Sequence, residues 1–192
     1  GVQTCALPIL DPLKEDSFLQ PISTYGASKL AGESLLSSYS YMFGIKGISF
    51  RFANVVGPNQ THGVGYDFIK KLRENSNRLE VLGNGTQTKS YIDVKDVVSA
   101  VLTANDKLSD GYEVFNVATL DYITVKEIAR MSIRALDLDE TTVDIVYGDS
   151  DRGWKADVPK IMLDSTKLRS FGWKSKLSSS DAMLQSLESM TK

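Results

Sequence analysis

Apolar residues along this chain switch repeatedly between helical spacing and short β-branched or aromatic runs. Helical spacing predicts helices over residues 27–43, 66–72, 97–108, 124–136 and 180–190. The runs between them predict strands or extended segments over residues 48–56, 79–82, 91–94, 114–117 and 144–147. Thr124 and Glu127 have the spacing of a capping box at a helix start. This alternation is typical of an α/β protein with a largely parallel sheet.

Composition excludes several classes of protein. The 192 residues include 22 Lys and Arg, 24 Asp and Glu and one His, which leaves a net charge of −2. This balance gives no positive field for nucleic acid or an anionic membrane, and no apolar run approaches the ~18 residues of a membrane span. Cys5 is the only cysteine, so a disulfide framework and a thiolate zinc site are excluded. We therefore expect a cytoplasmic protein without a nucleic-acid or membrane partner.

The first nine residues differ in character from the rest of the chain. They read GVQTCALPI and lack the basic region and long apolar core of a signal peptide. We predict that residues 1–9 are a non-native or disordered start, and the alternative is an ordinary native tail.

One of four Tyr–Lys pairs stands out by its context. A Lys four residues after a Tyr on a helix favours the ionised phenol, which can then act as acid or base toward a sugar or alcohol hydroxyl. The spacing alone says little, because it occurs at Tyr25/Lys29, Tyr66/Lys70, Tyr91/Lys95 and Tyr122/Lys126. Only the first pair lies among small residues, in TYGASKLAGE. Two glycines early in a helix suggest close approach of a ligand or another backbone.

A second polar position follows the predicted strand over residues 48–56. This strand contains Asn54 and runs into Gly57-Pro58, where an open α/β sheet places ligand contacts. His62, the single histidine, lies in the adjoining loop. We expect it to be a loop hydrogen-bonding residue rather than a catalyst.

Five blocks of sequence carry a family resemblance. They cover residues 21–29, 51–58, 63–69, 83–94 and 152–168 and read PISTYGASK, RFANVVGP, GVGYDFI, GNGTQTKSYIDV and RGWKADVPKIMLDSTKL. In this order they resemble the extended short-chain dehydrogenase/reductase family, in its NAD-dependent nucleotide-sugar epimerase/dehydratase branch. Within that branch the chain is most similar to bacterial and archaeal UDP-glucose 4-epimerases, over roughly residues 7–173.

The resemblance implies a fold and a set of partners. The chain would be the C-terminal part of a Rossmann-like parallel-sheet domain plus a small α/β substrate-binding lobe, with the N-terminal dinucleotide-binding half absent. Residues 10–60 would be the remnant of the Rossmann-like domain. Residues 61–192 would form mostly the lobe, with interleaved returns to the sheet. The implied cofactor is NAD, the implied substrate a nucleotide sugar such as a UDP-hexose, and the full-length parent would be a homodimer.

The resemblance also implies roles for single residues. Tyr25 would be the catalytic acid/base, and Lys29 would hold the nicotinamide ribose and favour ionised Tyr25. The cofactor set would be Tyr25, Lys29, Phe52, Asn54 and Val55. The substrate set would be Asn54, Tyr66, Asp67, Phe68, Leu82, Lys89, Tyr91, Arg152 and Asp157. The structural alternatives are core positions for Phe52 and Phe68, surface charges for Lys89 and Arg152, and a turn for Asp157.

Two departures from the family pattern limit the resemblance. Only Lys89 is basic within Gln87-Thr88-Lys89, where the family often has Arg, and Lys lacks the two-pronged guanidinium fork that binds phosphate. The chain also has no G-x-x-G-x-x-G, the motif that binds the pyrophosphate at a helix N-terminus. We therefore expect a truncated, inactive epimerase that would act through a transient 4-keto sugar. A dehydratase or reductase, or a non-catalytic nucleotide-sugar-binding or dimerisation module, is the alternative.

Overall fold

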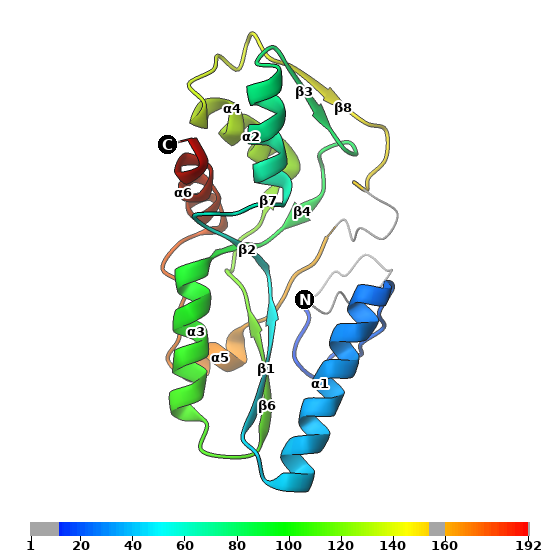
Figure 1. The fold of residues 1–192 in the computed structure, drawn as a ribbon, viewed down its shortest axis with the longest axis vertical. Helices are drawn as coiled ribbons and strands as arrows, with labels where there is room; N and C mark the ends of the chain where they lie inside the picture. The colour runs from blue at the N-terminus through cyan, green and yellow to red at the C-terminus, as the bar shows by residue number, and fades with distance from the viewer. Residues whose placement is uncertain (1–11, 154–159, 192) are drawn as a thin grey trace.

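Helices and strands alternate along the part of the chain that the structure describes. The computed structural model describes residues 12–153 and 160–191, so the start predicted for residues 1–9 lies outside it. The helices are α1 (Thr24–Phe43), α2 (Val64–Glu74), α3 (Val94–Lys107), α4 (Val125–Ala135), α5 (Thr166–Ser170) and α6 (Ser179–Thr191) (Figure 1). The strands are β1 (Gly47–Phe52), β2 (Asn54–Val56), β3 (Arg78–Val81), β4 (Thr88–Lys89), β5 (Tyr91–Asp93), β6 (Tyr112–Val117), β7 (Ile123–Thr124) and β8 (Asp144–Tyr147). The five predicted helices are confirmed, and the predicted strands fall on β1 to β3, β5, β6 and β8.

Most strand pairs are parallel, as the alternation predicts. β1 pairs with β6, β2 with β5 and β3 with β8, all in parallel, whereas β4 and β7 form a short antiparallel pair. The prediction of one strand over residues 48–56 is wrong, because Ala53 interrupts it. The Ala53 amide donates to the Val117 carbonyl (2.9 Å), and the next amide, that of Asn54, donates to Ser90 (3.2 Å). The chain thus leaves β6 and joins β5 at this point.

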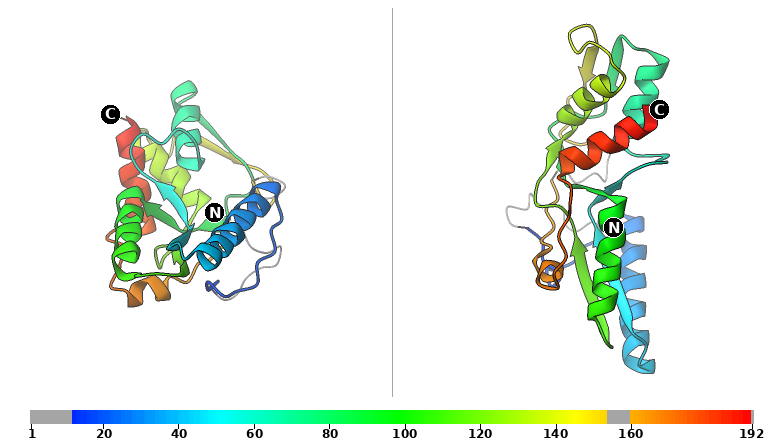
Figure 2. Two further views of the ribbon diagram at one scale, coloured as in Figure 1. Left: turned by 60° about the horizontal axis from the view of Figure 1, so that its bottom comes forward. Right: turned by 90° about the vertical axis from the view of Figure 1, so that its left-hand side faces the viewer.

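The β1–β6 pair separates two faces because side chains alternate along a strand. Ile48, Phe50 and Phe52 pack with α3 and α5 residues in one core cluster, built on buried Phe115 and Trp173. On the opposite face lies α1, whose Leu36 side chain would come within 3.2 Å of a Cβ at Gly47. Figure 2 shows α1 and α3 on opposite sides of these strands.

A second core cluster lies at the other end of the elongated molecule. Helices α2, α4 and α6 pack together beside β3 and bury Phe68, Leu72, Ile128 and Leu187 (Figure 1). α2 and α6 approach closely at Gly65, where a Cβ would lie 3.1 Å from both Leu187 and Met183. Between the two clusters the chain passes along β2, β4, β5 and β7, and this junction contains the candidate site.

Helix α1 is the least covered of the long helices. Only Gly26 and Ser40 are buried among its 20 residues. Tyr25 is exposed near its start, and its exposed large apolar side chains toward the other end are Leu35, Tyr39, Tyr41, Met42 and Phe43. None of the helices within residues 12–153 and 160–191 combines the length and apolarity that crossing a membrane requires.

Candidate functional site

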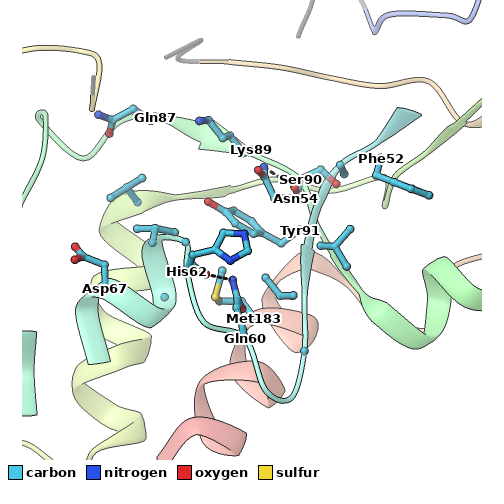
Figure 3. Close-up of a pocket in the computed structure, with 18 of the residues that line it drawn as sticks. Phe52, Asn54, Gln60, His62, Asp67, Gln87, Lys89, Ser90, Tyr91 and Met183 are labelled. Atoms are coloured by element: carbon cyan, nitrogen blue, oxygen red, sulfur yellow. Dashed lines mark hydrogen bonds between the residues drawn. The ribbon is translucent and has the colours of Figure 1, made fainter. Parts of the chain in front are cut away.

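A cavity of about 920 Å³ lies at the junction between the two core clusters. Its wall is built by the start of α1, the end of β1, all of β2, the loop over residues 57–63, the first turns of α2, and β4 with β5. Figure 3 shows the part of this wall that carries Phe52, Asn54, Lys89 and Tyr91. A cavity of this size is in the range that holds a small molecule or cofactor. The site therefore draws on segments that are far apart in the sequence.

Most of the predicted site residues meet on this wall. They are Tyr25, Phe52, Asn54, Val55, Asp67, Phe68, Leu82, Lys89 and Tyr91. Lys29 lies beside the wall rather than on it, and Tyr66 instead lines a second cavity of about 480 Å³ between α2 and α6. The Arg152 side chain is not part of the wall in the described region, although the neighbouring Gly153 is. Asp157 lies outside the described residues. The roles assigned to these residues stay predictions.

Tyr25 and Lys29 owe their positions to the start of α1. The Ser23 hydroxyl accepts a hydrogen bond from the Gly26 amide (3.0 Å), so the helix begins directly before Tyr25. One turn later Lys29 places its Nζ 5.3 Å from the centre of the Tyr25 ring. A cation at this distance interacts favourably with the ring and with any negative charge on its oxygen. The pair therefore has the composition needed to move a proton at the cavity edge.

A buried ion pair holds this helix against the sheet. Glu33 lies two turns after Tyr25 on the same helix face, and its carboxylate accepts two hydrogen bonds from Arg51. The Nε–Oε2 distance is 3.1 Å, and a third Arg51 nitrogen donates to the Glu15 carbonyl (2.9 Å). Because Arg51 is on β1, whose last residue Phe52 also lines the cavity, the pair links the Tyr25 helix to a strand of the cavity wall.

The Asn54 side chain has a defined orientation. Its Nδ2 donates to the Ser90 carbonyl (3.2 Å; Figure 3), which leaves Oδ1 as the group available to a ligand. Ser90 is held in turn by buried hydroxyls, since its Oγ lies 2.6 Å from Thr119 Oγ1, which lies 2.8 Å from Ser179 Oγ. This hydroxyl chain ends at the Asp121 carbonyl (3.0 Å). The network fixes an acceptor in the cavity wall.

Sequence reasoning missed several wall residues. Gln60, Gln87, Ser90 and Met183 all line the cavity, and Met183 comes from α6, more than 120 residues after Asn54. No local pattern marks Met183, whereas Gln87 and Ser90 flank the predicted Lys89. His62 also lines the cavity. Its backbone carbonyl, not its ring, accepts a hydrogen bond from Gln60 Nε2 (2.7 Å).

Charge on the wall is partly neutralised within the protein. Asp67 pairs with Lys71 at 2.8 Å, and Arg51 pairs with Glu33. Over the two described ranges of the chain, no three His, Cys, Asp or Glu side chains gather as a metal site would need. The wall therefore offers a phenol, an amide acceptor, basic groups and apolar surface from Phe52, Val55 and Phe68. Such a mixture suits a ligand with a flat ring, hydroxyls and negative charge.

Comparison with known proteins points to one family. The model of the NAD dependent epimerase/dehydratase family matches residues 4–118. A putative UDP-glucose 4-epimerase of Methanocaldococcus jannaschii is 30% identical over 167 residues, which cover 85% of this chain and 52% of that protein. This chain thus spans about half the length of that relative.

Solved structures give the same result. A UDP-galactose 4-epimerase crystal structure is 36% identical, with a TM-score of 0.80 over 93% of this chain and 57% of that one. The UDP-glucose 4-epimerase of Thermotoga maritima, solved with UDP-glucose, is 28% identical. Its TM-score is 0.81 over 96% of this chain and 58% of that one.

Proposed function

We propose that this chain, which belongs to the NAD dependent epimerase/dehydratase family, forms the part of a UDP-glucose 4-epimerase that binds the substrate and carries Tyr25. The observation that carries the proposal is the single cavity that brings Tyr25, Asn54 and Lys89 together, with Lys29 over the Tyr25 ring. The similarity to the Thermotoga maritima epimerase solved with UDP-glucose supports a UDP-hexose as substrate.

In the proposed reaction Tyr25 moves one proton. The ionised Tyr25 oxygen takes the proton of the sugar 4-hydroxyl, while the C4–H bond breaks and its electron pair leaves as hydride, so that C4 becomes a ketone. A bound NAD, held by Tyr25 and Lys29, would supply reversible hydride transfer, so that the hydride could return to the other face of the turned sugar. Tyr25 then gives the proton back to the oxygen at C4. Lys29 favours the ionised form of Tyr25 through its positive charge.

The described residues fit one end of NAD. Tyr25 and Lys29 would hold the nicotinamide ribose, and the apolar side chains of Phe52 and Val55 would border the ring. The pyrophosphate end requires a glycine-rich turn at a helix N-terminus, and these 192 residues contain no G-x-x-G-x-x-G. We therefore propose that this chain alone binds the nucleotide sugar but binds NAD weakly or not at all. A dinucleotide-binding half would complete the enzyme.

The same proposal assigns the parts of the chain. Residues 10–60 would belong with a Rossmann-like domain, and residues 61–192 mostly with the substrate lobe, apart from β6, which pairs with β1. The exposed apolar face of α1, which includes Leu35, Tyr39 and Met42, would meet a second copy in a homodimer of the parent enzyme.

Isothermal titration of the chain tests this division of roles. UDP-glucose is expected to bind, and NAD is expected to show no micromolar affinity. Micromolar binding of NAD to this chain would overturn the assignment. In an enzyme that contains both halves, Tyr25→Phe is expected to lower kcat about 10²- to 10⁴-fold. Tyr41→Phe, on the same helix but 93% exposed, is the matched control and is expected to leave kcat unchanged.

Two alternatives to the epimerase are distinguished by what happens to UDP-glucose. The matching family also includes dehydratases, and a 4,6-dehydratase would convert a nucleotide glucose into a 4-keto-6-deoxy sugar, whose methyl group gives a distinct proton NMR signal. An epimerase interconverts UDP-glucose and UDP-galactose without this signal. The exposed apolar face of α1 favours the second alternative, a binding or dimerisation module. Such a module would bind UDP-glucose without any turnover, even with the dinucleotide-binding half supplied.

A further inference from the structure

His62 lies in a loop that is held firmly by its backbone. The Gln60 side chain donates from Nε2 to the His62 carbonyl (2.7 Å), and its Oε1 accepts from Ser186 Oγ of α6 (3.1 Å). Ser186 also bonds to both the amide and the carbonyl of Gly57 (3.2 Å each). The loop between β2 and α2 is therefore tied to α6 through one hydroxyl, that of Ser186, and these bonds do not involve the His62 ring.

The His62 imidazole lines the cavity. Figure 3 shows the ring directed into the space that Asn54, Lys89 and Tyr91 also line. Neither ring nitrogen has a hydrogen-bond partner within residues 12–153 and 160–191. An imidazole has two nitrogens that donate or accept, and both donate when the ring is protonated. This ring is thus positioned to bond a ligand rather than to stabilise the loop.

Charge on the surrounding wall identifies the ligand group that fits. The ionisable groups that share the cavity with His62 are Tyr25 of α1, Arg51 of β1, Asp67 of α2, Lys89 of β4 and Tyr91 of β5. Asp67 is paired with Lys71, and Arg51 with Glu33, so neither adds an uncompensated charge. Lys89 supplies a point charge without the fork that Arg would offer. A protonated imidazole would add a positive charge to this wall, and the diphosphate of a nucleotide sugar is the doubly negative group that such a charge favours.

We infer that protonated His62 binds the diphosphate of the nucleotide sugar in this cavity. The inference rests on the proposed function, because it takes the nucleotide sugar as ligand. Histidine changes its charge between pH 5 and 8, so the affinity for a diphosphate ester rises as pH falls through this range. A diphosphate that is esterified at both ends stays doubly negative throughout. The expected gain is about three- to tenfold, the size of one charge-assisted contact at a partly exposed site.

Calorimetric titration with UDP-glucose between pH 5.5 and 8.0 tests the inference. The wild-type dissociation constant is expected to fall about three- to tenfold toward pH 5.5, with net uptake of protons on binding in buffers of different ionisation enthalpy. His62→Gln is expected to abolish both the pH dependence and the proton uptake. His62→Lys, which keeps a positive charge at pH 8.0, is expected to hold tight binding across the whole range. Lys70→Gln, which removes a charge that lines the second cavity, is the control and is expected to behave as wild type.

The outcomes separate the inference from the proposed function. Uridine, which lacks phosphate, is expected to show no dependence on His62. If UDP-glucose binds and His62→Gln keeps the wild-type pH dependence, the inference is wrong and the proposed function stands. If UDP-glucose does not bind the wild-type chain at any pH, the proposed function fails and the inference fails with it. Thermal melting of each variant verifies that the loop has kept its fold.

Discussion

A largely buried ion pair between Arg51 and Glu33 joins the helix of Tyr25 to β1, the strand that directly precedes β2 and Asn54. Their side chains are only 7% and 12% exposed, so removal of one partner leaves the other charge unpaired and largely shielded from water. We expect Glu33→Gln to lower the free energy of unfolding by about 3 kcal/mol or more, measured by urea denaturation. Arg78→Ala, which breaks exposed pairs with Glu80 and Asp144, is the control and is expected to cost less than about 1 kcal/mol. Equal losses in the two variants would contradict this account.

Ionisation of Tyr112 at alkaline pH is expected to lower the free energy of unfolding. Burial raises the pKa of its phenol, against the smaller lowering effect of its hydrogen bond to Ser49 (2.9 Å). A raised pKa in the folded state contributes stability that is complete below pH ~10 and is lost as pH rises through the folded value. Tyr112→Phe is expected to cost about 1 kcal/mol at pH 7, from the lost hydrogen bond, and to flatten the decline above pH 10. Urea denaturation from pH 8 to 11 measures both effects, and Tyr41→Phe is expected to keep the wild-type slope.

At the scale of elements, Gly32 is a position of α1 where the surroundings leave room for a side chain. It lies in the helix interior, and a Cβ there would meet none of the described residues within 4 Å. We expect Gly32→Ala to raise the free energy of unfolding by about 1 kcal/mol, since alanine is the better helix former. Gly111 also has open space around it, but its φ of +75° disfavours any side chain, so Gly111→Ala is expected to destabilise. A destabilising Gly32→Ala in chemical denaturation would show that something packs against this face.

The elements that the sequence predicts well are those with strong local signals. The capping box of α4 is one example. Thr124 Oγ1 accepts a hydrogen bond from the Glu127 amide (3.2 Å), and the Glu127 carboxylate accepts one from the Thr124 amide (2.6 Å). The break at Ala53 gives no such signal, since residues 48–56 are mostly apolar or aromatic and the change of partner depends on distant Val117 and Ser90. Helix α5 has five residues, too few for a helical period to show.

The residues of the candidate site also differ in how well the sequence predicts them. Tyr25, Asn54 and Lys89 could be chosen from sequence because each lies in a distinctive motif, and all three reach the cavity. Neighbours on α2 show the limit, since Asp67 lines this cavity whereas Tyr66 lines the other. A helix turns by about 100° per residue, so adjacent side chains face different surroundings that the motif alone does not specify. Met183 reaches the wall through the packing of α6, which only the folded chain reveals.

At the scale of the whole molecule, long-range contacts join the parts around the cavity. Leu13 bonds through its amide to Met162 (2.8 Å), and its carbonyl accepts from Asp164 (2.8 Å) and from the side chain of Asn116 (2.8 Å). These bonds connect the first described residues, β6 and the segment before α5. Because the cavity wall uses both core clusters, a ligand that fills it binds the folded chain and not the unfolded one.

Ligand binding is therefore expected to raise the melting temperature of the whole chain, by an amount that grows with the logarithm of ligand concentration over the dissociation constant. UDP-glucose at 100 times its dissociation constant is expected to add about 2.7 kcal/mol, or roughly 5–10 °C for a chain of this size. NAD at the same concentration is expected to shift the transition by less than about 1 °C, because the 192 residues contain no glycine-rich pyrophosphate motif. Differential scanning calorimetry measures both shifts. Leu102→Ala, on the exposed face of α3, is the control and is expected to keep the UDP-glucose shift. An equal shift with NAD would place a complete dinucleotide site within this chain and remove the need for a second half.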